Sequence, residues 1–124
     1  MTNEPMRTVR FIHTENEDDL IVSFALSIAD DPTDVESLTL LRTPKYEVFL
    51  DERERGVRVS FELDEKALLK EFAFDRDAAT VLLRTSEGIF EVDLRSVSRA
   101  EITEMIKVLK LMNFDRRIEI SGLE

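Results

Sequence analysis

The chain's single histidine lies beside a group of carboxylates, in the segment HTENEDDL at residues 13–20. Histidine and carboxylate side chains bind metal ions and act as general bases, so His13 and its neighbours are the first candidates for chemistry. A specific metal site needs several ligands that converge from rigid elements, and a calcium loop needs a central glycine. The first glycine in this chain is Gly56. We therefore expect no metal here, and we expect His13 to end a strand, partly packed near Phe11.

Other catalytic patterns are equally weak. A Ser-His-Asp arrangement needs a histidine and a strained serine turn, but no serine lies in a G-x-S-x-G sequence. Three glycines cannot form a phosphate-binding or dinucleotide-binding loop, and pairs of carboxylates arise by chance among 27 acidic residues. We expect no enzymatic activity and no cofactor. An enzyme of an unrecognised type stays as an alternative, which would need perturbed carboxylates in a pocket.

The net charge of −10 is concentrated near the N-terminus, where residues 1–36 contain nine acidic residues and only two arginines. A surface of this sign repels the phosphates of nucleic acids and anionic lipid headgroups, and it attracts basic partners. Acidic surfaces also favour solubility, which is the simpler explanation of the overall charge. Because the acids are clustered, we expect a basic protein partner and no binding to nucleic acid or membrane.

Two acidic segments are the candidate partner-binding residues. The first precedes an apolar run at residues 20–28, and the second follows that run. Loop carboxylates stay ionised and solvated, so they can accelerate the encounter with a basic partner. The candidates are Glu15, Glu17, Asp18, Asp19, Asp30, Asp31, Asp34 and Glu36.

Apolar residues with a period of two dominate the elements that must position these loops. LIVSFALSI at residues 20–28 places five large apolar side chains on one face, as a half-buried strand does. TVRFIH before it alternates as well, with Val9 and Phe11 on one face, so residues 14–19 are predicted to be a hairpin loop. Pro32 lacks the N–H that a sheet ladder requires, so residues 29–36 are predicted to be a loop.

The same pattern continues through the middle of the chain. Strands are predicted at 37–43, 46–52, 57–63, from about Leu69 to Phe74, at 79–85 and at 88–94. Gly56 and Gly88 are predicted to supply the turn conformations of two hairpins, 46–63 and 79–94. Residues 64–70 are ambiguous between helix, loop and strand. We expect the phenylalanines, Phe24, Phe61, Phe72 and Phe74 among them, to lie in the core.

A change of period after Leu94 predicts one helix. Ser98 and Glu101 match a capping box, in which each side chain bonds the other residue's N–H. Five apolar residues then follow at helical spacing: Ile102, Met105, Ile106, Leu109 and Met112. Asn113 is predicted to end the helix, and residues 116–120 to add a short edge strand.

These elements predict an α+β fold in which β predominates. About eight strands form a curled antiparallel sheet or a two-layer roll, closed by the C-terminal amphipathic helix. The order is analogous to a pleckstrin-homology-like roll. The length of 124 residues suits one domain with a core from about 7 to 120. The chain has no cysteine and no run of apolar residues typical of a signal peptide or membrane span, so we expect a cytoplasmic location.

Four segments together resemble the tenth immunity-protein family of bacterial polymorphic toxin systems. They are VRFIHTENEDDLIVSFA, SLTLLRT, GVRVSFE and EITEMIKVLKLMNF, and the similarity extends over roughly residues 7–114. The resemblance implies a protein that neutralises a toxin by binding it, without catalytic residues of its own. The alternative is a pleckstrin-homology-like adaptor for a peptide. Its lipid-binding form is disfavoured, because the early loop carries acids where phosphoinositides need lysine and arginine.

Overall fold

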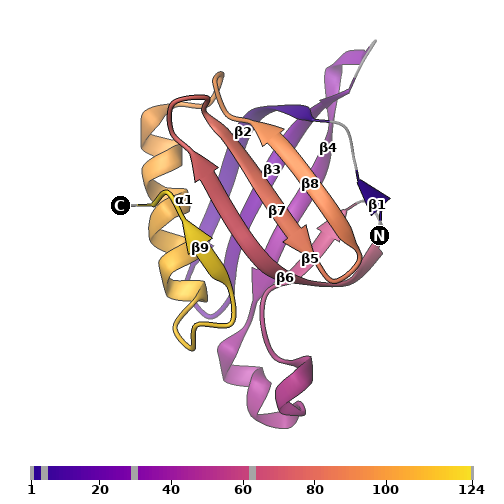
Figure 1. The fold of residues 1–124 in the computed structure, drawn as a ribbon, viewed down its shortest axis with the longest axis vertical. Coiled ribbons are helices and arrows are strands. Elements are labelled where there is room, and N and C mark those ends of the chain that lie inside the picture. The colour runs from indigo at the N-terminus through magenta and orange to yellow at the C-terminus, as the bar shows by residue number, and fades with distance from the viewer. Residues whose placement is uncertain (1, 4–5, 29–30, 62–63, 124) are drawn as a thin grey trace.

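The computed structural model of the chain describes residues 2–3, 6–28, 31–61 and 64–123 (Figure 1). Strands dominate it, as the period-two pattern predicts. In chain order the elements are β1 (Thr2–Asn3), β2 (Arg7–Asn16), β3 (Leu20–Ile28), β4 (Asp31–Arg42), the 3₁₀ helices η1 (Pro44–Phe49) and η2 (Glu52–Glu54), β5 (Arg58–Phe61), β6 (Asp64–Asp75), β7 (Thr80–Thr85), β8 (Gly88–Asp93), the α-helix α1 (Arg99–Met112) and β9 (Glu119–Ser121).

Strands β2 to β8 close into a roll. Each of these strands pairs antiparallel with the next, and β8 then pairs with β2 at Arg7 and Thr8. Because seven antiparallel strands in succession leave the first and last pointing the same way, this closing pair has to be parallel. The α+β, mainly β prediction is confirmed. The sheet is mixed, since β1 and β9 also pair parallel, with β8 and β6.

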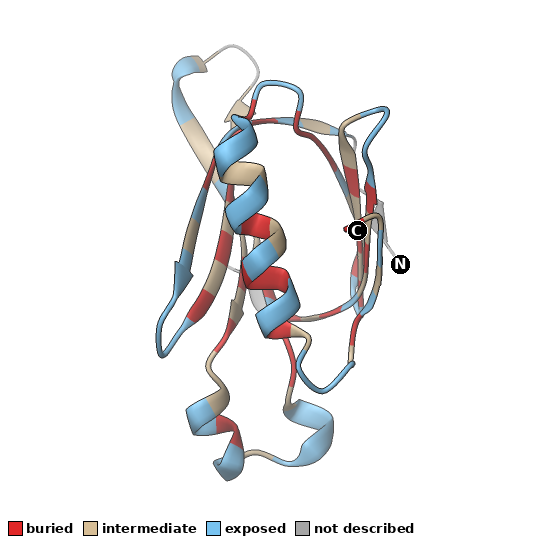
Figure 2. Cartoon of the chain, turned by 90° about the vertical axis from the view of Figure 1, so that its left-hand side faces the viewer, coloured by how far each residue is buried: buried red, intermediate tan, exposed pale blue. Residues whose placement is uncertain are grey.

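The inward faces of the strands form one apolar core. Phe24 and Phe72 are fully buried and Phe74 is nearly so, as predicted, whereas Phe61 is partly buried at the margin of the core. Helix α1 covers the open side between the two layers of the roll (Figure 2). Its buried side chains are Met105, Val108, Leu109 and Met112, and Ile102 and Ile106 pack against the core while remaining partly exposed.

The start of α1 confirms one half of the predicted capping box. The Ser98 hydroxyl accepts a hydrogen bond from the N–H of Glu101 at 3.2 Å. The Glu101 carboxylate instead accepts the N–H of Ile12, at 2.6 Å. Strand β2 pairs with β8 only at its first residues, so the N–H of Ile12 needs another acceptor, and the helix supplies it. Asn113 is the C-terminal cap, as predicted.

A bulge in β2 corrects the prediction for the first strand. The pairing with β3 shifts between Val9 and Phe11, and the extra residue reverses the inward and outward positions. Val9 is therefore fully buried and Phe11 is 49% exposed, so the two do not share a face. The strand continues to Asn16, so His13 lies within it and not at its end. Its side chain is 62% exposed, which contradicts the predicted packing.

A second bulge explains why residues 31–36 belong to a strand and not to the predicted loop. The partner of Ser27 is Val35 and the partner of Ile28 is Asp31, so residues 32–34 bulge out of the ladder. Pro32 is tolerated there because bulged residues do not donate to the ladder. The sequence prediction treated proline as the end of pairing, but here it marks only an interruption.

The predicted strand 46–52 is wrong, and so is its hairpin with residues 57–63. Residues 44–56 instead form a projecting arm that contains η1 and η2, and β5 pairs with β4 at residues 38–41 (Figure 1). Pro44 begins η1 with the fixed φ that helices accept at this position. Gly56 does adopt a positive φ, of 135°, but it ends the arm. Residues 62–63, the end of the predicted strand 57–63, lie outside the described residues.

The remaining strands follow the prediction with shifted limits. The ambiguous segment 64–70 is strand, since β6 begins at Asp64 and not near Leu69. Strands β7 and β8 form the predicted hairpin, but its turn is at residues 86–87, where the Thr85 hydroxyl accepts the N–H groups of Glu87 and Gly88. Gly88 itself is the first residue of β8. The predicted final strand is present as β9, at residues 119–121.

The core assignment predicts a graded response to truncation. We expect Phe72→Ala to lower the free energy of unfolding by about 3 to 5 kcal/mol, because it leaves a large cavity among fully buried neighbours. Ile106→Ala should cost less, since its side chain is partly exposed. Leu111→Ala, on the exposed face of α1, is the control. Urea denaturation of the three variants measures the order, and equal midpoints for Phe72→Ala and Leu111→Ala would contradict the assignment.

Candidate functional site

The first acidic segment forms the tip of the β2–β3 hairpin. Strand β2 extends to Asn16, so only residues 17–19 connect the two strands. We call Glu15, Glu17, Asp18 and Asp19 the acidic tip; all four side chains are exposed. The structure therefore brings these four predicted residues together at one end of the roll.

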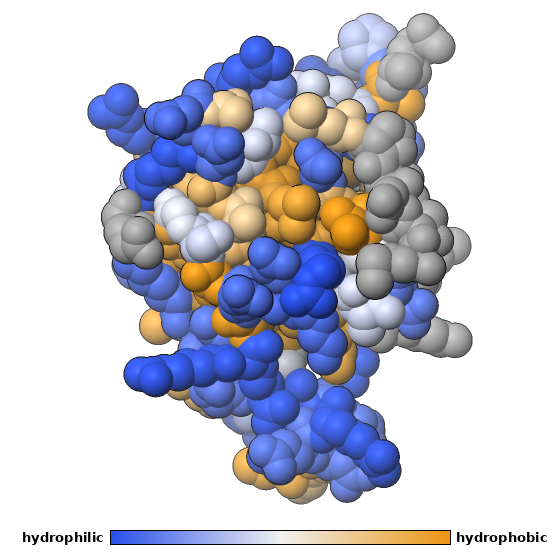
Figure 3. All heavy atoms as spheres, in the orientation of Figure 1, coloured by the Kyte–Doolittle hydropathy of each residue, from blue (hydrophilic) through white to orange (hydrophobic). Residues whose placement is uncertain are grey.

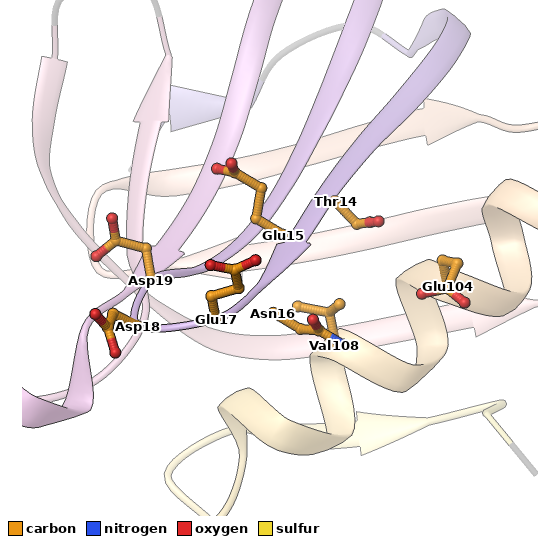
Figure 4. A pocket seen from close by; sticks show the side chains of 8 residues that line it. All are labelled: Thr14, Glu15, Asn16, Glu17, Asp18, Asp19, Glu104 and Val108. Atoms are coloured by element: carbon orange, nitrogen blue, oxygen red, sulfur yellow. The ribbon is translucent and has the colours of Figure 1, made fainter.

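A cleft of about 460 Å³ separates the acidic tip from helix α1 (Figure 4). The tip and strand β2 form one wall, and Glu104 and Val108 from α1 lie opposite (Figure 4). Among the described residues that line it, the charged side chains are all acidic: Glu15, Glu17, Asp18, Asp19 and Glu104. Five carboxylates around a hollow attract cationic groups and repel phosphate and other anions. Glu104 was not predicted, and only the packing of α1 beside β2 reveals it.

The carboxylates of the cleft are spread out and do not converge on one point (Figure 4). Within the described residues, no group of three or more histidine or acidic side chains is placed to hold a metal ion. His13 does not line the cleft, and its Nε2 lies 4.0 Å from Glu15 Oε2. This arrangement suits a cationic surface that covers the cleft better than a single bound ion.

The second acidic segment lies at the other end of β3, so it does not join the acidic tip. Basic side chains from β2 hold this segment, because Arg10 donates to the carbonyl of Pro32 and Arg7 lies 3.5 Å from Glu36. Asp31 accepts two hydrogen bonds from Thr33, through its hydroxyl and its N–H, which lower the pKa of the Asp31 carboxyl. Asp34 is exposed, and Asp30 lies outside the described residues. The seven predicted residues that the structure describes are thus divided between two surfaces at opposite ends of β3.

The arm adds apolar side chains at the same end as the acidic tip. Tyr46, Val48 and Phe49 are 59%, 70% and 82% exposed. The sequence prediction missed them because it assigned the segment to a strand with alternate residues inside. The available signal was Pro44, because proline is favoured in the first turn of a helix.

A buried arginine fixes the arm to the roll. The Arg42 side chain, at the end of β4, is fully buried and makes paired hydrogen bonds of 2.8–2.9 Å to both carboxylate oxygens of Glu47. It makes a second pair, of 2.8 Å, to Asp115, and one bond of 2.8 Å to the carbonyl of Met112. These bonds use all five N–H donors of the guanidinium. The ring of Phe114 lies over the group, with its centroid 4.2 Å from Cζ.

The arm is also joined to the acidic tip. The Thr43 hydroxyl donates to Asp19 at 2.6 Å, and Lys45 forms an ion pair with Asp18 at 2.7 Å. On the other side of the arm, Arg117 donates to the carbonyl of Glu52 at 3.0 Å. The hairpin tip, the arm and the C-terminal end of α1 therefore form one connected surface.

Comparisons with protein-family models, curated proteins and solved structures give no match for this chain. Helix α1 has 14 residues, and no helix of the described part of the chain is long and apolar enough to cross a membrane.

The buried arginine predicts a specific response to acid. Hydrogen bonds from Arg42 and then Arg117 hold the pKa of Asp115 well below its usual range. Because the folded pKa lies below the unfolded value of about 3.9, the stabilisation is essentially complete above about pH 5 and is lost progressively as the pH falls further. We expect Asp115→Asn to lower the free energy of unfolding at pH 7 by about 1 to 3 kcal/mol. The deficit should shrink toward pH 2.

Urea denaturation at pH 7, 4 and 2.5 measures this difference. Asp77→Asn, in the exposed turn between β6 and β7, is the matched control and should follow the wild-type curve. A constant deficit for Asp115→Asn at all three pH values would show that the ionised carboxylate does not contribute to the stability of the fold.

Proposed function

We propose that this chain is a non-catalytic binding protein, and specifically an immunity protein that neutralises a basic toxin domain by direct contact. The observation that carries the proposal is the cleft between the acidic tip and α1, whose charged lining is entirely acidic. The resemblance of residues 7–114 to an immunity-protein family supports the same class. Neutralisation by binding also agrees with carboxylates that are exposed and spread out, since a catalytic pair would need to converge on a substrate.

The charge of the cleft favours fast capture of a basic partner. Five carboxylates lie within one hollow, and the Debye length of about 10 Å at 0.1 M salt lets neighbouring charges act together. Complementary charges mainly accelerate association, and they raise specificity by repelling partners of the wrong sign. An immunity protein gains from speed, because the toxin has to be captured before it reaches its target. In this role the chain acts inside the cytoplasm of the cell that makes the toxin.

The test is protection of cells from the candidate toxin. The genes beside this chain's gene are searched for a toxin domain, and a candidate found there is produced from an inducible promoter, with and without the chain. Survival only when the chain is present, together with a stable complex of the two purified proteins, supports the proposal. Killing that the chain does not prevent would refute the immunity role.

Charge reversal tests the role of the cleft. We expect the triple variant Glu15→Lys, Glu17→Lys and Glu104→Lys to slow association with the toxin domain by about tenfold or more at low salt, and by less at 0.5 M salt. Asp18 and Asp19 are left unchanged because Asp18 pairs with Lys45 of the arm and Asp19 accepts a hydrogen bond from Thr43, just before the arm. Stopped-flow association at two salt concentrations gives the rates.

The matched control changes the net charge by the same amount, but at residues away from the cleft. Glu87→Lys, Glu91→Lys and Glu119→Lys replace exposed acids on the sheet of β7, β8 and β9. This variant should associate much faster than the cleft variant at low salt. Equal slowing by both variants would mean that only the overall charge of the protein matters and that the cleft is not the contact surface.

A further inference from the structure

The arm exposes three large apolar side chains, Tyr46, Val48 and Phe49, and Lys45 Nζ lies 5.0 Å from the centroid of the Tyr46 ring. Phe49 is 82% exposed and Val48 is 70% exposed, on a segment that projects beyond the end of the roll (Figures 1 and 2). Apolar atoms are visible along the lower edge of the molecule, next to hydrophilic side chains (Figure 3). Apolar groups rimmed by polar residues are typical of sites where another molecule binds.

The geometry of η1 explains why Tyr46 and Phe49 point outward on the same side of the arm. A 3₁₀ helix has three residues per turn, so side chains at positions i and i+3 lie on the same face. Pro44 and Glu47 therefore share one face of η1, and Glu47 on this face is buried against Arg42. Tyr46 and Phe49 share another face, and both are exposed. The sequence thus presents two aromatic rings on one side of a short helix.

The arm is held in place, which lowers the entropic cost of using it for binding. Glu47 accepts two hydrogen bonds from Arg42 and a third from the N–H of Gly56, so the two ends of the arm meet at one buried carboxylate. Arg55 donates to the carbonyl of Leu50 within the arm at 3.2 Å. A surface that is already ordered loses less freedom when a partner binds.

We propose that Tyr46 and Phe49 are the apolar anchor of this protein, and that they insert into an apolar pocket on the basic partner that the acidic tip attracts. This inference rests on the proposed function, and it assigns the binding energy to the arm and the speed of capture to the cleft. Aromatic side chains are enriched in the cores of protein interfaces, and a few residues there, Tyr often among them, carry most of the binding energy. The hydroxyl of Tyr46 provides a polar end for such a ring.

Charge complementarity identifies the occupant as a basic protein. Thr43 and Lys45 bond to Asp19 and Asp18, so whatever covers the arm also approaches the acidic tip. A second copy of this chain would bring the same acidic surface against it, at a net charge of −10 for each copy. Anionic lipid is repelled for the same reason. A partner with positive charge around an apolar pocket matches both features.

Dissociation kinetics with the toxin domain used in the protection test probe the anchor. We expect Tyr46→Ala and Phe49→Ala each to raise the dissociation rate by about tenfold or more, with association rates within about twofold of wild type. Phe11→Ala is the matched control, because Phe11 is an exposed aromatic on β2, away from the arm, and its removal should leave both rates unchanged. Thermal unfolding of each variant checks that the fold is retained.

The outcomes separate the two proposals. If the wild-type chain binds the toxin domain but both arm variants dissociate at the wild-type rate, the anchor is refuted and the proposed function stands. If the wild-type chain does not bind, the proposed function fails and the anchor fails with it. Sedimentation and flotation with phosphatidylcholine vesicles cover the other occupants. A dimer, or vesicle binding, that Phe49→Ala abolishes would refute the inference of a basic protein partner.

Discussion

The buried guanidinium of Arg42 is the interaction on which the functional end of this molecule depends. Removing a charged group from water costs free energy unless the polar groups around it are paired. Here two carboxylates and a backbone carbonyl accept hydrogen bonds from all five N–H donors of Arg42. The acceptors come from the arm and from the end of α1. One side chain at the end of β4 therefore fixes the position of two segments that are far apart in the sequence.

This constraint places charge and apolar surface side by side. Glu47 is held inward by Arg42, and the three-residue period of η1 then turns Tyr46 and Phe49 outward. The same end of the roll carries the hairpin tip, to which the arm is bonded through Asp18 and Asp19. An acidic cleft and an aromatic arm next to each other suit the capture of a basic protein with an apolar pocket. The opposite end carries a second acidic segment, which arginines partly neutralise.

Two bulges show why strand prediction from alternation succeeds for the sheet but fails for particular residues. The hydrophobic pattern has a period of two only while the pairing register is continuous, and an extra residue reverses it. Phe11 is outside and Val9 inside for this reason. Pro32 lies within a strand because its missing N–H falls in the bulge. The bulge in β2 has no signal in the local sequence, and Pro32 is compatible with either a loop or a bulge until the pairing of β3 with β4 is known.

The sequence by itself determined the class of the fold, the strands of clear alternation, the helix from Ser98 to Asn113 and the acidity of the hairpin tip, because these follow from local periodicity and composition. Only the tertiary structure decided the closure of the roll, the place of Glu104 in the cleft and the exposure of Phe49. Each of these depends on contacts between distant segments. A buried ion pair such as that of Arg42 is specified by its partners in space, and a one-dimensional pattern does not contain them.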